Sequence, residues 1–163
     1  MRRLAFAVLS LAFLATACQP VTTEMTEEQK AAIADTVNAA HADSWDAWRE
    51  VDLDRALSYQ HDSPDLWFTL QGQVLRGYAE ADSFWREGFG TASRIDITIS
   101  DSRTMVLAAD VVAVLEQGVF SVTDAAGVTS PEQAFAFSAT WVRRDGEWKV
   151  LYGHESWPQP ESM

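Results

Sequence analysis

Residues 141–150 read WVRRDGEWKV, and this stretch determines how the second half of the chain is arranged. Asp145-Gly146 is a dipeptide favoured in two-residue hairpin turns, whose two positions both need positive φ. Segments rich in strand-forming residues flank it at 135–144 and 147–157. We therefore predict two antiparallel strands joined by a tight turn.

The turn also sets the register of the predicted hairpin, with Arg144 opposite Glu147. Successive side chains alternate across a strand, so every second pair lies on the same face. One face then carries the pairs Arg143–Trp148, Trp141–Val150, Ala139–Tyr152, Phe137–His154 and Phe135–Ser156. This face is the more aromatic one, so we expect it to point inward. The opposite face, with small residues plus Leu151 and Trp157, is a candidate homodimer surface.

His154 allows two interpretations in this arrangement. A buried imidazole needs a hydrogen-bond partner. The simpler interpretation is a core histidine that is bonded to an aspartate or to a backbone carbonyl. The other is ligand contact or proton transfer, because imidazole titrates near neutral pH. His41 lies beside the apolar stripe of its helix, and we expect it to be solvated or capping.

Helices precede the strands along the chain. A capping box, Thr26 to Gln29, starts the first helix, and Asp52 caps the second. The predicted helices are 26–50, 53–59 and 78–89, and the predicted strands before the hairpin are 65–70, 74–76, 94–100, a short piece at 105–108, and 111–123. This order predicts an α+β fold in which helices cover one face of a curved antiparallel sheet.

The N-terminus has the parts of an export signal: two arginines, an apolar stretch at 4–17 and small residues before Cys18. The stretch is shorter than the roughly 20 residues of a spanning helix. We therefore predict a signal peptide at 1–17 and a tether at 18–25. The folded domain is expected at 26–158, with a tail at 159–163.

Cys18 is the only cysteine in the chain. Small residues followed by cysteine resemble the lipobox of bacterial lipoproteins, although Ala15 stands where lipoboxes usually carry leucine. Cleavage by ordinary signal peptidase after Ala17 is the alternative. The expected location is the periplasmic side of a bacterial membrane as a lipoprotein lipidated on Cys18, or a secreted or periplasmic soluble form.

Composition excludes several function classes. The net charge of −12 argues against nucleic acid, and membrane contact is expected only through a lipid. The three histidines, at 41, 61 and 154, are far apart and lack metal-ligand spacing, so we predict no metal site. Nucleotide-binding and serine hydrolase motifs are missing from the sequence, and we expect no cofactor.

Three segments resemble the NTF2-like superfamily, especially its SnoaL-like and DUF4440-type members. They are residues 72–77 (GQVLRG), the hairpin at 141–150 and His154-Glu155-Ser156, and the likeness covers about 28–158. The resemblance implies a cone, in which a bent sheet wraps around three helices and a cavity opens at the wide end. The superfamily includes isomerases, cyclases, dehydratases, dehydrochlorinases and binding domains, so the fold alone does not decide function.

Three functions remain open. The sequence favours binding of a small apolar molecule in the cone, since the seven tryptophans suit an aromatic pocket. One alternative is a cofactor-free enzyme of the isomerase, cyclase or dehydratase type that uses His154 with a carboxylate, and the other is a dimeric interaction module. The predicted pocket-lining residues are Tyr59, Asp65, Trp67, Phe137, Trp141, Tyr152, His154 and Ser156.

Overall fold

The computed structural model describes residues 24–158. The predicted signal peptide (1–17), Cys18 and the predicted tail (159–163) lie outside the described residues, as does most of the predicted tether. In chain order the elements are α1 (Glu27–Arg49), α2 (Leu53–Ser58), β1 (Trp67–Leu70), β2 (Gln73–Arg76), α3 (Tyr78–Phe89), β3 (Ala92–Ala108), β4 (Val111–Asp124), β5 (Gln133–Arg144) and β6 (Glu147–Ser156).

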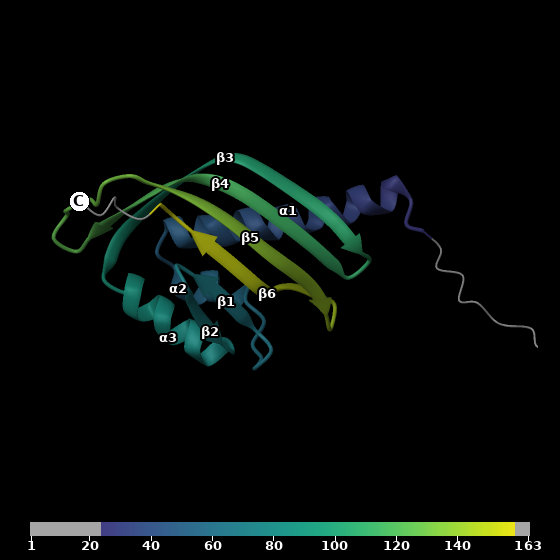
Figure 1. The fold of residues 1–163 in the computed structure, drawn as a ribbon, viewed down its shortest axis with the longest axis horizontal. Coiled ribbons are helices and arrows are strands. Elements are labelled where there is room, and N and C mark those ends of the chain that lie inside the picture. Colours follow the sequence, from purple (N-terminus) through teal and green to yellow (C-terminus); the bar gives the residue numbers. More distant parts are fainter. Residues whose placement is uncertain (1–23, 159–163) are drawn as a thin grey trace, which may run out of the picture.

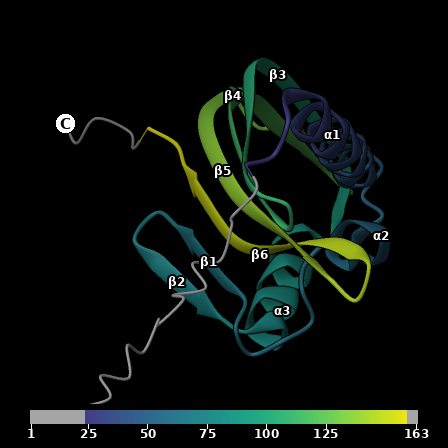
Figure 2. The ribbon, with the colours of Figure 1, turned by 90° about the vertical axis from the view of Figure 1, so that its right-hand side faces the viewer.

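The strands form one six-stranded sheet in the order β2-β1-β6-β5-β4-β3. Neighbouring strands are antiparallel except β1 and β6, which are parallel. The sheet is strongly curved and unclosed, and it wraps around the three helices on its concave side (Figures 1 and 2). The predicted α+β cone is confirmed.

Side-chain caps fix the starts of the first two helices. The backbone N–H of Gln29 donates to Oγ1 of Thr26 at 3.2 Å, and the Thr26 N–H donates to Oε1 of Gln29 at 2.9 Å. The Arg55 N–H donates to Oδ1 of Asp52 at 3.1 Å. Each bond satisfies an amide that has no partner within the helix, so both predicted caps are confirmed.

β3 is one long strand where two separate pieces are predicted. The polar stretch at 100–104 continues the strand. The register with β4 shifts between Ile99 and Asp101 and again between Val106 and Ala108, so Ser100 and Leu107 are the extra residues. β3 is an edge strand, and polar side chains are well tolerated where one side of a strand has no partner.

The hairpin turn is as predicted, with positive φ at both Asp145 and Gly146. Arg144 pairs with Glu147 and Trp141 with Val150, but Thr140 then pairs with Tyr152. Leu151 is therefore the extra residue of a β-bulge. The predicted pairs Ala139–Tyr152, Phe137–His154 and Phe135–Ser156 are wrong, and Glu155 lies opposite Phe137.

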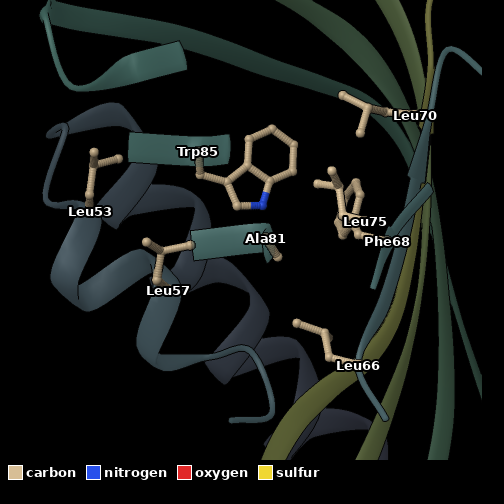
Figure 3. Packing of buried hydrophobic residues seen from close by; sticks show 8 residues of the cluster. All are labelled: Leu53, Leu57, Leu66, Phe68, Leu70, Leu75, Ala81 and Trp85. Atoms are coloured by element: carbon tan, nitrogen blue, oxygen red, sulfur yellow. The ribbon is translucent and has the colours of Figure 1, made fainter. Parts of the chain in front are cut away.

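Two hydrophobic clusters build the core. The first joins α2 and α3 to β1 and β2, with Trp85 between the α2 leucines and the side chains of the two strands (Figure 3). The second joins α1 to β4, β5 and β6 around Trp141. Phe137 packs against both clusters, and it therefore lies at the centre of the cone.

Gly153 is required by the close approach of Phe68. A Cβ built on Gly153 would lie 2.2 Å from a ring carbon of buried Phe68. We expect Gly153→Ala to lower the free energy of unfolding by about 1–3 kcal/mol, because overpacking displaces neighbouring groups. Urea denaturation measures this. Gly88→Ala is the control, since its Cβ would meet nothing within 4 Å. Equal stability of the two variants would contradict the prediction.

Candidate functional site

A cavity of about 290 Å³ lies inside the cone between the sheet and the helices. Its wall takes residues from both hydrophobic clusters and is predominantly aromatic. The aromatic side chains that line it are Trp45, Trp48, Tyr59, Phe68, Phe84, Trp85, Phe89, Phe120, Phe135, Phe137, Trp141 and Trp157.

Glu155 places a carboxyl group in this aromatic wall. On the inner face of the sheet it stands between Phe137 on β5 and Leu70 on β1. Among residues 24–158 its side chain has no ion pair and no hydrogen bond. Burial disfavours the charged form and raises the pKa of Glu155 to about 7. The cavity thus contains an isolated carboxyl group that titrates near neutral pH.

A second carboxyl group, on Glu116 of β4, belongs to a buried polar cluster with α1. Its Oε2 lies 2.9 Å from Nε2 of His41 and accepts the indole N–H of Trp45 at 2.7 Å. Its Oε1 accepts the hydroxyl of Ser102 at 2.9 Å. His41 is 6% exposed, so the expectation that it is solvated is wrong.

The environment of Glu116 favours its ionised form. Burial on its own raises the pKa of this carboxyl group, but the hydrogen bond and electrostatic attraction of His41, with the hydrogen bonds from Trp45 and Ser102, together outweigh it and lower the pKa. An ionised Glu116 only accepts, so Nε2 of His41 carries the proton in this bond. The imidazole is therefore held in one orientation at the cavity wall.

Phe137 separates the two carboxyl groups. It pairs with Glu116 on one side and with Glu155 on the other, so all three side chains share the inner face. The His41 ring stacks on Phe137 with centroids 5.8 Å apart and an interplanar angle of 13°. The two carboxyl pKa values shift in opposite directions, a pattern typical of groups with different chemical roles.

The cavity wall also contains buried polar atoms without partners. Within residues 24–158, Oε1 of Gln60 and the indole nitrogens of Trp85 and Trp141 have no hydrogen bond. All three residues line the cavity. Each of these three atoms is itself covered by neighbouring atoms, so the cavity wall offers its polar contact to a ligand through other groups.

Three of the predicted pocket residues line the cavity: Tyr59, Phe137 and Trp141. The Tyr59 hydroxyl donates to the carboxylate of Asp43, so this hydroxyl is already engaged. Tyr59 and Trp141 therefore contribute their ring surfaces to the wall, with centroids 6.1 Å apart.

Five predicted pocket residues do not line it: Asp65, Trp67, Tyr152, His154 and Ser156. Trp67 is 46% and Tyr152 40% exposed, and His154 is exposed on the outer face of the sheet. The inward placement of His154 is wrong because the bulge at Leu151 exchanges the two faces of β6 beyond it. For the same reason Trp157, expected on the outer face, lines the cavity.

Sequence reasoning missed Glu155, Glu116 and Gln60. A glycine inside a strand often marks a bulge, so Gly153 is the signal that could have placed Glu155 inward. The partnership of His41 with Glu116 spans 75 residues, and nothing local in the sequence announces it.

Two further searches cover the described residues only. No group of three or more His, Cys, Asp or Glu side chains is arranged to hold a metal ion within residues 24–158. In that same part of the chain, each helix is too short or too polar to cross a membrane.

The model of the SnoaL-like domain family matches residues 37–160. No curated protein matches the chain.

Many solved structures share the fold. A nuclear transport factor 2-like superfamily protein from Salmonella enterica has a TM-score of 0.70 and 14% identity, and the match covers 81% of this chain and 95% of that one. A hexachlorocyclohexane dehydrochlorinase from Novosphingobium barchaimii has a TM-score of 0.66, 14% identity and coverages of 82% and 92%. A ketosteroid isomerase-like protein from Erwinia carotovora has a TM-score of 0.65, 18% identity and coverages of 83% and 100%.

Proposed function

Because the chain belongs to the SnoaL-like domain family, with an NTF2-like cone, we propose that it binds a small, largely apolar molecule inside the cone. The observation that carries this proposal is the aromatic cavity of about 290 Å³. Its size lies near the lower end of the range of about 300–1,000 Å³ that small-molecule pockets span. Protein interiors contain few voids larger than a water molecule, so a cavity of this size is better explained by a ligand than by loose packing.

Filling the cavity tests the proposal. Ser44 on α1 lines the cavity, whereas Ala39 on the same helix is exposed. We expect Ser44→Phe to weaken binding of the neutral fluorescent probe N-phenyl-1-naphthylamine about tenfold or more, because the new ring occupies the space that the probe needs. Ala39→Phe is the matched control and should leave binding unchanged. Equal affinity of the two variants would place the probe outside the cone.

Proton transfer by Glu155 is the second candidate function. A general base works best when its pKa lies near the working pH, and Glu155 meets this condition inside the cavity. The proteins of this fold that are described as a dehydrochlorinase and as ketosteroid isomerase-like make such chemistry a reasonable expectation. His154 takes no part, since it lies on the other face.

Carbon-bound hydrogen exchange tests this second candidate without knowledge of the substrate. The protein should accelerate exchange of the α-hydrogens of 2-tetralone in D₂O, as followed by NMR. The rate should rise as pH increases through about 7, because the ionised form of Glu155 is the base. Glu155→Gln should return the rate to that of buffer. Retention of the acceleration in this variant would exclude Glu155 as the base.

We also propose that the protein is exported and anchored by a lipid on Cys18, on the basis of the signal-like residues before it. Metabolic labelling with a fatty acid should mark the wild-type protein and not Cys18→Ser. Unchanged membrane association of Cys18→Ser would remove the anchor while leaving the fold and cavity unaffected.

A further inference from the structure

The part of the cavity wall that the structure describes carries a carboxyl group but no basic side chain that could neutralise it. Within the described chain, the wall has no lysine and no arginine. His41 on the wall is already bonded to Glu116. Glu155 is thus a carboxyl group that faces the cavity with no cationic partner among residues 24–158.

Aromatic residues flank Glu155 on β5 and along β6, and Leu70 is its neighbour on β1. Phe137 is its cross-strand partner, and Trp157 follows two residues later on the same face. Phe120 bridges Phe135 and Trp157, with ring centroids 5.9 and 6.1 Å apart, and Trp45 contacts Phe137 at 5.2 Å. The faces of such rings carry negative electrostatic potential, which attracts cations.

We propose that this part of the cavity is a binding site for a small organic cation, an amine that carries an apolar body, with Glu155 as its counter-ion and the flanking rings as a cage. The inference rests on the proposed function, because it names the class of molecule that the cone binds. An ammonium group in this place would make a charge-assisted hydrogen bond to the carboxylate and lie against aromatic faces.

Other ligand classes fit the wall less well. A carboxylate or phosphate would meet Glu155, with Glu116 behind Phe137, and find no basic side chain on the part of the wall that the structure describes. The net charge of −12 also repels anions and attracts cations to the protein. A neutral ligand would leave Glu155 without an ionic partner.

Binding of a cation would also be linked to proton release. Burial keeps much of Glu155 protonated at neutral pH, and a bound ammonium group would ionise it. The other titratable groups on the wall are His41 from α1 and Tyr59 after α2, with Glu116 of β4 joined to His41. The described parts of α3 and β1 on this wall contribute apolar side chains and Gly88.

Three ligands with one skeleton test the proposal by isothermal titration calorimetry: 2-naphthylmethylamine, 2-naphthylmethanol and 2-naphthoate. With the wild-type protein at about pH 7.5 we expect the amine to bind about tenfold or more tightly than the alcohol, and the carboxylate to bind most weakly. Glu155→Gln should remove the advantage of the amine and leave the affinity for the alcohol within about twofold. Glu132→Gln, which makes the same change of charge at an exposed site, should keep the advantage.

Titration of the amine at about pH 6.5 in phosphate and in ACES buffer, whose ionisation heats differ, measures the proton that leaves Glu155. We expect release with the wild-type protein and none with Glu155→Gln. Equal affinity of amine and alcohol, or an advantage of the amine that survives in Glu155→Gln, would overturn the inference and leave the apolar-ligand proposal standing. Failure of all three ligands and of N-phenyl-1-naphthylamine to bind would overturn both.

Discussion

Glu116→Ala lowers the free energy of unfolding by about 3–5 kcal/mol, the cost of leaving buried polar groups without their charged partner. The carboxylate of Glu116 accepts hydrogen bonds from His41, Trp45 and Ser102, and its side chain is only 5% exposed. Alanine would remove this acceptor from buried His41 and would leave the Trp45 indole N–H only its 3.1 Å contact with Nε2 of His41. Urea denaturation of the two proteins at neutral pH measures the loss.

Glu132→Ala is the control for this measurement, because Glu132 is exposed and has no side-chain partner in the described chain. We expect it to change stability by less than about 0.5 kcal/mol. The sign of the pH dependence is a second check. The pKa of Glu116 is lowered, so its stabilisation is present above the ordinary value of 4.5 and is lost as pH falls below it. A cost of under about 1 kcal/mol for Glu116→Ala would contradict the prediction.

Glu155→Gln should raise the free energy of unfolding relative to the wild-type protein, and this gain should develop as the pH rises to about 7. The folded protein holds the pKa of Glu155 at about 7, against an ordinary value of 4.5. Stability from this group is complete below pH 4.5 and is lost as pH rises to about 7, because the unfolded chain ionises more readily. The difference corresponds to about 3 kcal/mol.

Glutamine cannot ionise, so the variant escapes this loss. Its stability relative to the wild-type protein should increase by about 3 kcal/mol between about pH 4 and pH 8, measured by urea denaturation at both values. Any change in stability caused by the glutamine amide itself is the same at both pH values, so the comparison isolates the effect of ionising Glu155. Glu132→Gln should show no such increase, and a pH-independent difference for Glu155→Gln would refute the raised pKa.

Local signals predicted most of the fold. The Asp145-Gly146 turn, the caps at Thr26 and Asp52 and the apolar alternation of the strands each act over a few residues, and the structure has them where the sequence places them. The bulge at Leu151 was not predicted, because residues 147–156 continue as strand formers and β6 is held by two neighbours at once. Its position depends on how β6 fits between β1 and β5.

The candidate site depended on contacts that the sequence does not reveal. His41 lies beside the apolar stripe of its helix, yet the curved sheet brings Glu116 against it and buries both side chains. The aromatic character of the cavity was predictable from the abundance of tryptophan. The identity of its carboxyl group was not, since one extra residue at 151 decides whether His154 or Glu155 faces inward.

The bulge has an evolutionary consequence. Gly153, His154, Glu155 and Ser156 alternate between the two faces of β6, and Leu151 sets the phase of that alternation. In a relative without the extra residue, an unchanged terminal sequence would turn its imidazole into the cone and its carboxyl group to the outside. A single-codon insertion or deletion would thus exchange the ionisable group of the cavity, with no substitution in the cavity wall.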